Sequence, residues 1–302
     1  MSAPRGDRVT ILMACYKAAF LGEAVASALA QTNVDFEVWC IDDGSADATR
    51  ALLEDYARRD ARVRVLEHPG RRNRGQAASY NLALPQVTTE FIAFLDDDDR
   101  WRPAKLERQL ALFRERPEVD LAYVNGDKID ANGRVLWGFM PDDHREMNRP
   151  ELLLLDSYVT PSAVMLRRRL AERVGPFAED LLPSDHDYFV RAAEAGVLAY
   201  IPEKLFDCRL HPGQVQRTLQ AQRDGFKILR RACRRRRYPL WVRRKRRAVC
   251  HYLLADALVA GGRWFGGALH FLAAGLLDPR RAISVGAQRA RRAVRRRARA
   301  AS

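Results

Sequence analysis

Four consecutive aspartates, Asp96–Asp99, are the residues of this 302-residue chain whose types and spacing most clearly suit chemistry. They follow the apolar run 91–95, which reads as a strand buried on both faces. Crowded carboxylates repel one another, and Mg²⁺ prefers a few carboxylates together with substrate phosphates. Because ligands bind at the carboxyl ends of strands in open α/β sheets, the run predicts a metal–diphosphate site. For this segment alone, an acidic loop that caps the next helix is the alternative.

A second acidic strand end lies at Asp42 and Asp43, which close the apolar run 36–41 and lead into Gly44. A carboxylate there could accept a hydrogen bond from a ribose hydroxyl or a base N–H, and a simple polar turn is the alternative. The chain has no Gly-x-Gly-x-x-Gly, no Gly-x-x-x-x-Gly-Lys-Ser/Thr and no Gly-x-Ser-x-Gly. These absences exclude the usual dinucleotide, P-loop and hydrolase sites and leave the acidic strand ends as the candidate chemistry.

The elements that must position these acids alternate along the first 125 residues. We expect strands at 9–14, 36–41, 63–66, 91–95 and 121–124. We expect helices at 20–30, 45–60, 75–84 and 103–113. This alternation predicts an α/β fold with a mainly parallel sheet and helices on both faces.

The pattern changes in residues 126–215, which read as mixed α+β. Asn132-Gly133 is a strong hairpin signal between strands at 128–130 and 134–139. Helices are expected at 149–155 and 185–195, and strands at 162–166, 198–201 and 206–210. We therefore expect a first domain at 1–215, with halves 1–125 and 126–215, followed by a basic helical extension at 216–302.

Charge separates the two parts of the chain. The net charge is +14, but residues 221–302 hold 23 Lys+Arg against 3 Asp+Glu, whereas residues 1–220 carry −6. The arginines cluster at 234–237, 243–247 and 291–299, near apolar segments 248–260 and 264–277. Each apolar segment is too short to span a bilayer and fits a helical hairpin.

This basic extension suggests peripheral contact with an anionic membrane surface. A solvated hairpin or a protein-partner surface is the alternative. Binding of nucleic acid is not expected, because no recognisable module accompanies the arginines. The five cysteines are scattered without Cys-x-x-Cys, and no signal-peptide core is evident. We expect a cytoplasmic protein, with attachment to the inner face of the cell membrane as an option.

Taken in order, these segments resemble inverting family 2 glycosyltransferases of the GT-A fold. The matching segments are 9–17, 27–32, 42–47, 73–81, 94–106, 175–177, 185–191 and 209–211. The chain departs from the family where Ala14 and Lys17 replace its usual Pro and Asn, and where Ser184 replaces its frequent Glu.

The resemblance implies a nucleotide-binding set. Ala14 and Tyr16 would line the base, Asp43 would bind uracil or ribose, and Arg74 would approach the nucleotide. Asp97 would share the nucleotide contacts.

The resemblance also implies a metal set and a base. Asp96 and Asp98 match the family's Asp-x-Asp, with Asp98 the direct ligand of Mn²⁺ or Mg²⁺, and His211 would complete the metal–diphosphate site. Asp99 would be structural. Asp185 matches the catalytic base, although a helix N-terminus also favours acids and would lower the pKa of this carboxyl, whereas burial would raise it.

The function implied is transfer of one sugar from a nucleoside-diphosphate sugar, with UDP expected, to a hydroxyl of a glycan or lipid-linked acceptor in surface polysaccharide or glycoconjugate synthesis. The Gln-x-x-Arg-Trp of processive synthases is missing. Alternatives are a sugar-nucleotide-binding scaffold without turnover, or a nucleic-acid-binding protein that acts through the arginine-rich tail.

Overall fold

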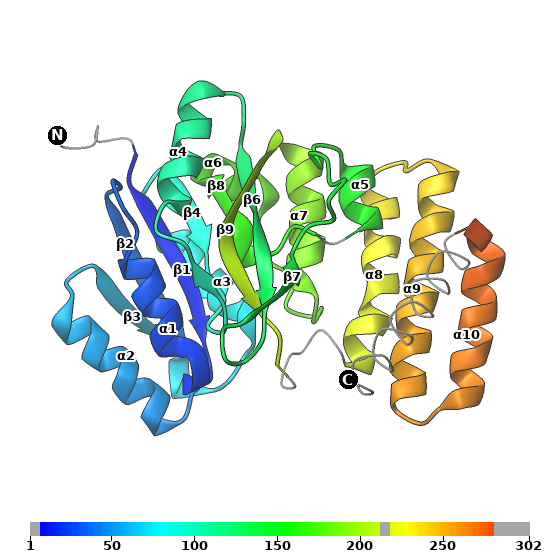
Figure 1. Cartoon of the computed structure of the whole chain (residues 1–302), viewed down its shortest axis with the longest axis horizontal. Coiled ribbons are helices and arrows are strands. Elements are labelled where there is room, and N and C mark those ends of the chain that lie inside the picture. Colours follow the sequence, from blue (N-terminus) through cyan, green and yellow to red (C-terminus); the bar gives the residue numbers. More distant parts are fainter. Residues whose placement is uncertain (1–6, 157, 212–217, 281–302) are drawn as a thin grey trace, which may run out of the picture. The chain divides into compact units, whose positions relative to one another are not determined.

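The computed structural model describes residues 7–156, 158–211 and 218–280 (Figure 1). Contacts within the chain divide it into two units, Met1–Gln214 and Val215–Ser302, which we call the body and the extension.

The first half of the body is a parallel sheet in the order β3-β2-β1-β4. Its strands are β1 Val9–Cys15, β2 Phe36–Asp42, β3 Val63–Glu67 and β4 Phe91–Phe94. The connecting helices are α1 Ala18–Leu29, α2 Asp47–Arg59 and α3 Gln76–Ala83, with short 3-10 turns at Pro69–Arg71 and Leu84–Gln86. From β1 the chain winds outward through β2 to β3, and then returns to place β4 on the other side of β1. This reversal makes the carboxyl ends of β1 and β4 the topological switch point, where open α/β sheets bind ligands.

The second half extends the same sheet through antiparallel and parallel pairs. Its strands are β5 Arg100–Trp101, β6 Leu121–Ile129, β7 Val135–Gly138, β8 Val164–Arg167 and β9 Leu198–Arg209. Its helices are α4 Lys105–Glu115, α5 Pro150–Leu155, α6 Arg168–Val174 and α7 Ser184–Ala195. β8 lies antiparallel between β4 and β6, and β9 runs parallel to β6. The expected α/β fold is confirmed, as is the hairpin at 132–133, which joins β6 to antiparallel β7.

Three strand predictions needed correction. The segments 121–124 and 128–130 belong to the single strand β6, and 198–201 and 206–210 to the single strand β9. Lys204, which lies between the two predicted segments, pairs with Asn125, and the register shifts on both sides of Asn125. The strand predicted at 162–166 begins only at Val164, because Pro161–Ala163 forms a 3-10 turn.

The extension contains three described helices. They are α8 Leu219–Arg235, α9 Leu240–Ala260 and α10 Trp264–Leu277. α9 packs against both α8 and α10, and Gly261-Gly262-Arg263 turns the chain between α9 and α10 as the helical-hairpin pattern predicted. Within the described ranges, no helix combines the length and the apolar run needed to cross a membrane.

Candidate active site

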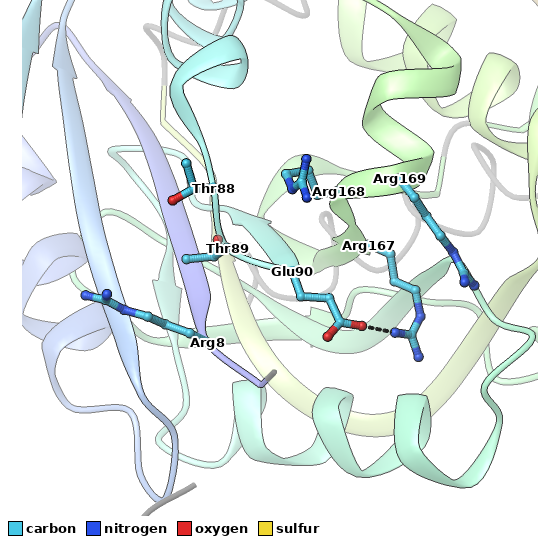
Figure 2. Close-up of a pocket in the computed structure, with 7 residues that line it drawn as sticks. All are labelled: Arg8, Thr88, Thr89, Glu90, Arg167, Arg168 and Arg169. Atoms are coloured by element: carbon cyan, nitrogen blue, oxygen red, sulfur yellow. Dashed lines mark hydrogen bonds and ion pairs between the residues drawn. The ribbon is translucent and has the colours of Figure 1, made fainter. Parts of the chain in front are cut away.

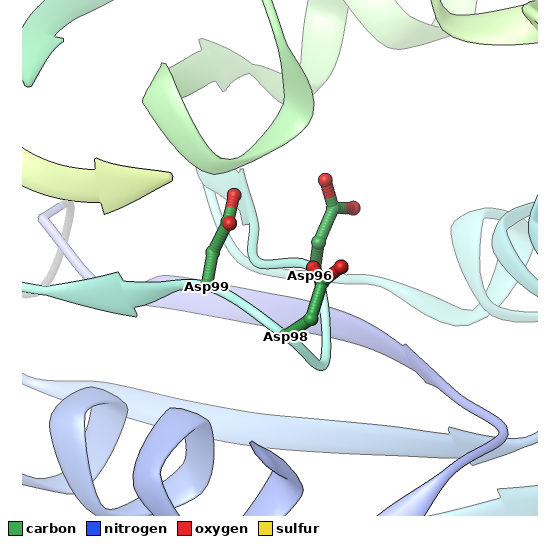
Figure 3. A group of neighbouring side chains, drawn as sticks. All are labelled: Asp96, Asp98 and Asp99. Atoms are coloured by element: carbon green, nitrogen blue, oxygen red, sulfur yellow. The ribbon is translucent and has the colours of Figure 1, made fainter. Parts of the chain in front are cut away.

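Three carboxylates gather in the turn that follows β4 (Figure 3). Oxygen atoms of Asp96, Asp98 and Asp99 all lie within 4.8 Å of one another. The backbone N–H of Asp99 donates to the Asp96 carbonyl at 3.2 Å and closes the turn. Asp96 and Asp98 are half-buried and Asp99 is buried. The structure thus brings together the two expected acids. It adds Asp99, for which we expected only a structural role.

Burial and mutual repulsion make this cluster electrostatically unfavourable in the protein alone. Burial, followed by the charges of Asp99 and Asp98, raises the pKa of Asp96 well above its usual value. Burial and the Asp98 charge raise the pKa of Asp99 to about 7. Among the described residues, no Lys or Arg forms an ion pair with any of the three carboxylates. A set of hard oxygen donors with excess negative charge fits Mg²⁺ or Mn²⁺.

His211 and Arg209 hold the cluster from the end of β9. His211 Nε2 lies 2.8 Å from Asp98 Oδ2, so the expected proximity of this histidine to Asp98 is present. The backbone N–H of Arg209 donates to Asp99 Oδ1 at 2.9 Å, and its buried guanidinium donates to the Asp98 carbonyl at 2.9 Å. The acidic turn is therefore fixed by backbone and side-chain bonds from a distant strand.

Asp97 bridges the switch point instead of joining the cluster. Its Oδ2 accepts hydrogen bonds from the backbone N–H groups of Tyr16 at 2.9 Å and Lys17 at 3.2 Å. This contact fixes the chain just beyond Ala14, at the carboxyl end of β1. The Tyr16 side chain is 46% exposed there, so its ring is accessible to a flat ligand.

Asp43 fixes a second loop beside this edge. Its buried carboxylate accepts the backbone N–H of Arg74 at 2.7 Å and of Gly75 at 2.9 Å. Gly44 has φ +70°, and a Cβ there would lie 2.4 Å from the backbone N of Asn73, so only glycine fits. The guanidinium of Arg74 is exposed and lies 3.7 Å from Glu179. His68 Nε2 lies 3.6 Å from Asp43 Oδ1, so the carboxylate is surrounded by donors of the protein itself.

Asp185 stands in the first turn of α7. Burial raises its pKa to about 6, against the lowering effect of the His186 backbone N–H. Burial therefore outweighs the helix terminus at this position. After burial and the charges of Asp99 and Asp98, the charge of Asp185 also contributes to the raised pKa of Asp96.

Three further residues that sequence reasoning missed contact Asp96. Gln76 Nε2 donates to Asp96 Oδ1 at 2.6 Å, and the Tyr80 hydroxyl lies 3.4 Å from the same oxygen. Ser162 Oγ accepts the backbone N–H of Asp96 at 3.1 Å. The i, i+4 spacing of Gln76 and Tyr80 puts both on one face of α3 and was a usable signal. Ser162 carried no such signal.

The opposite edge of the sheet contains a basic cavity (Figure 2). It has a volume of about 490 Å³ and is lined by Arg8, Thr88, Thr89, Glu90, Arg167, Arg168 and Arg169. Arg167 pairs with Glu90 and also donates to the carbonyls of Phe113 and Val119, each at 3.1 Å. Arg169 pairs with Asp120 at 2.8 Å. Because these arginines already have acidic partners, we expect them to stabilise the fold.

Comparison with known proteins identifies the family. The model of the family described as Glycosyl transferase family 2 matches residues 10–175. The succinoglycan biosynthesis protein ExoO of Rhizobium meliloti is 29% identical over 262 residues, covering 80% of this chain and 72% of that protein.

Two solved structures share the fold. The mannosyltransferase PcManGT from Pyrobaculum calidifontis, in complex with GDP-Man and Mn²⁺, matches with a TM-score of 0.63 at 18% identity, covering 95% of this chain and 81% of that one. TarS from S. aureus, in complex with UDP-GlcNAc, matches with a TM-score of 0.61 at 18% identity, covering 88% and 81%. At these identities the structures support the fold alone. With the family match spanning more than half of the chain, the protein belongs to glycosyl transferase family 2.

Proposed function

We propose that the protein is an inverting glycosyltransferase that moves a single sugar from a nucleoside-diphosphate sugar to a hydroxyl of a glycan or lipid-linked acceptor. UDP is the nucleotide we expect, and surface polysaccharide or glycoconjugate synthesis is the process. The name of ExoO supports such a process, and the nucleotide sugars bound to TarS and PcManGT support the donor class. The observation that carries the proposal is the acid cluster at the switch point.

Asp96 and Asp98 would hold the cation, Mn²⁺ or Mg²⁺, with His211 beside Asp98 and Asp99 within the same cluster. When bound, the cation supplies positive charge that stabilises the departing diphosphate. Gln76 and Tyr80 orient the Asp96 carboxylate through their hydrogen bonds to Oδ1. The chain thus provides a pre-shaped set of ligands at the carboxyl end of β4.

The nucleotide would lie along the ends of β1 and β2. Ala14 and exposed Tyr16 would line the base, and Asp43 would accept a hydrogen bond from a base N–H or a ribose hydroxyl. Asp97 keeps the backbone at Tyr16 in place, and Asp43 does the same for Arg74. The guanidinium of Arg74 would then reach toward the nucleotide from an exposed position.

Asp185 would be the base. The acceptor hydroxyl gives its proton to the Asp185 carboxylate as its oxygen bonds to the anomeric carbon. The bond from that carbon to the diphosphate oxygen breaks on the opposite side, so one displacement inverts the configuration. With its pKa at about 6, Asp185 is ionised at neutral pH and still basic enough to accept a proton efficiently.

The proposal also covers the organisation of the chain. Residues 1–215 form the transferase domain, with a nucleotide-sugar half at 1–125 and an acceptor half at 126–215, and residues 216–302 form the extension. We propose that 221–302 attach the enzyme peripherally to an anionic membrane surface from the cytoplasmic side. The net charge of +20 in this segment supports such attachment.

A donor screen tests the transferase proposal. Purified protein is incubated with UDP-, GDP- and dTDP-sugars in Mn²⁺ or in EDTA, and released nucleotide is measured. We expect release with at least one donor in Mn²⁺ and none in EDTA. A scaffold without turnover would instead bind a donor and release no nucleotide with any acceptor glycan or lipid-linked sugar.

A further inference from the structure

One face of α10 is apolar and exposed. Phe265, Leu269, Leu272 and Leu276 are 81%, 53%, 62% and 71% exposed, and Trp264 beside them is 69% exposed. Their spacing of four, three and four residues places Phe265 and the three leucines on a single helical face. We call these four residues the α10 stripe. Scattered exposed leucines are ordinary, but a continuous apolar row of this kind marks an interaction surface.

The opposite face of α10 packs on α9, so the stripe points away from its neighbour. Gly267 and Ala274 are buried against α9, and a Cβ on Gly267 would lie 2.5 Å from Val259 Cγ2. The helices therefore approach closely along that side. No described residue of the extension covers the stripe, whose members stay more than half exposed.

The charged residues next to the stripe are mostly arginines. α10 contains no Asp, Glu, Lys or Arg between Trp264 and Leu277. Exposed Arg263 precedes the helix, and half-buried Asp278 and exposed Arg280 follow it. On α9, exposed Arg244 reaches the end of α10 and donates to the Leu277 carbonyl at 2.7 Å. An apolar face with a cationic rim complements a bilayer surface, where leucine and phenylalanine enter the acyl boundary and arginine meets lipid phosphates.

Other occupants fit these observations less well. A second copy would bring two segments of net charge +20 together, and their repulsion opposes self-association. A membrane-spanning role is excluded by length, because α10 has 14 residues and a span needs roughly 20. An anionic bilayer supplies both the opposite charge and the apolar phase.

We propose that α10 is an interfacial membrane helix whose stripe inserts into the surface of an anionic bilayer. This inference rests on the proposed peripheral attachment of the extension and adds the element that inserts. The arginines supply attraction over a distance, and the stripe supplies the apolar contact that persists when salt screens the charges.

Vesicle sedimentation of the full-length protein tests this proposal. The probe is sucrose-loaded vesicles of phosphatidylcholine with about one third phosphatidylglycerol, at low and high salt. The variants are Leu272→Ser with Leu276→Ser, and, as a matched control, Leu240→Ser with Trp241→Ser, which are exposed on α9 outside the stripe. We expect the stripe variant to lose about tenfold or more in partitioning, given two exposed leucines removed, and the control to stay within about twofold. A second stripe variant, Phe265→Ser with Leu269→Ser, should repeat the loss, and circular dichroism checks that each variant folds.

The outcomes separate the proposals. Equal binding of stripe variants and wild type would overturn insertion and leave electrostatic attachment standing. Absence of vesicle binding by the wild type would overturn both. Stripe-dependent dimerisation in vesicle-free buffer would assign the face to a second copy and contradict the proposal. Donor-dependent nucleotide release, measured without vesicles, reports on the transferase proposal independently.

Discussion

The body's sheet has a carboxyl edge, where β1 and β4 end, and an amino edge, where these strands begin. The charged side chains are paired at the amino edge and unpaired with cations at the carboxyl edge. At the amino edge, Arg167 pairs with Glu90 (Figure 2) and also donates to backbone carbonyls. Arg169 pairs there with Asp120 and donates to the Pro117 carbonyl. At the carboxyl edge, Asp96, Asp98 and Asp99 crowd together (Figure 3), and no described Lys or Arg pairs with them. Both edges belong to one sheet and are built from the ends of neighbouring strands.

This difference separates stabilising charges from charges arranged for binding. A buried cation that is paired and hydrogen-bonded keeps the fold intact, and loss of one partner is costly. Crowded carboxylates with raised pKa values weaken the free protein and gain stability only when positive charge arrives. We therefore expect substitutions at the carboxyl edge to change turnover, and those at the amino edge to change stability.

The largest effect is expected for Asp98→Asn. Because the substitution removes a cation ligand, turnover should fall by about 100-fold or more, as for loss of other groups that stabilise a leaving charge. The free energy of unfolding without metal should stay within about 1 kcal/mol, since a like charge is removed from the cluster. Nucleotide release and urea unfolding check both expectations. Asp47→Asn on α2 is the matched control, because it makes the same change in charge and should leave turnover unchanged. Full turnover in Asp98→Asn would contradict the proposed division between the two edges.

Asp185→Asn should follow in size. Loss of the base should reduce transfer by about 100- to 10,000-fold while donor affinity is retained, because the amide keeps the shape of the side chain. Donor titration and initial rates with acceptor measure the two properties. Asp187→Asn is the control. Asp187 lies two residues further along α7 and pairs with Arg191, so its substitution should lower stability more than it lowers transfer. Retained transfer in Asp185→Asn would remove this residue from its proposed role.

Arg167→Met tests the amino edge. The change removes donors to two carbonyls and to Glu90, so the free energy of unfolding should fall by about 1–3 kcal/mol, while the rate per folded molecule stays the same. Arg168→Met is the control, since Arg168 forms a surface pair with Glu172 and should change stability little. A loss of turnover comparable with that of Asp98→Asn would show that the two edges do not divide as proposed.

The smallest effect is in the pH dependence of stability. Folding raises the pKa of Asp99 to about 7 and of Asp185 to about 6, so their contribution to stability is present at low pH and is lost as the pH rises through those values. Asp120 contributes in the opposite sense. Burial would raise the pKa of Asp120, but hydrogen bonds from Arg169 and Arg173 lower it below its usual value. Its contribution to stability is therefore lost only as the pH falls through that lowered pKa. Without metal, stability should therefore decline between about pH 5 and pH 7.5. Urea unfolding across this range should show a flatter profile for Asp99→Asn, and an unchanged profile would contradict the assignment.

Much of the carboxyl edge was predictable because it follows local pattern. Continuous apolar runs located β1, β2 and β4, and acids directly after them located Asp43 and Asp96. The environment of these acids was not predictable from local pattern. Contacts of Asp96 with Gln76, Tyr80 and Ser162 depend on tertiary packing.

Elsewhere the local pattern was incomplete or ambiguous. Two strands were expected at 198–201 and 206–210, yet β9 continues between them through a bulge that sequence periodicity does not reveal. For Asp185, sequence left burial and helix terminus in balance, and the structure shows that burial determines the pKa. In α10, the apolar pattern predicted a helix but did not indicate that Leu272 and Leu276 face outward.

We propose that the carboxyl edge becomes a donor site when a divalent cation neutralises its acids. Calorimetric titration of a nucleoside-diphosphate sugar into the wild-type protein, with Mn²⁺ and with EDTA, tests this most directly. We predict saturable binding in Mn²⁺ and a loss of affinity of about tenfold or more in EDTA, since each 1.4 kcal/mol of lost charge stabilisation is a factor of ten. Equal affinity in the two conditions would show that the donor binds without help from the cation, which is the opposite of our proposal.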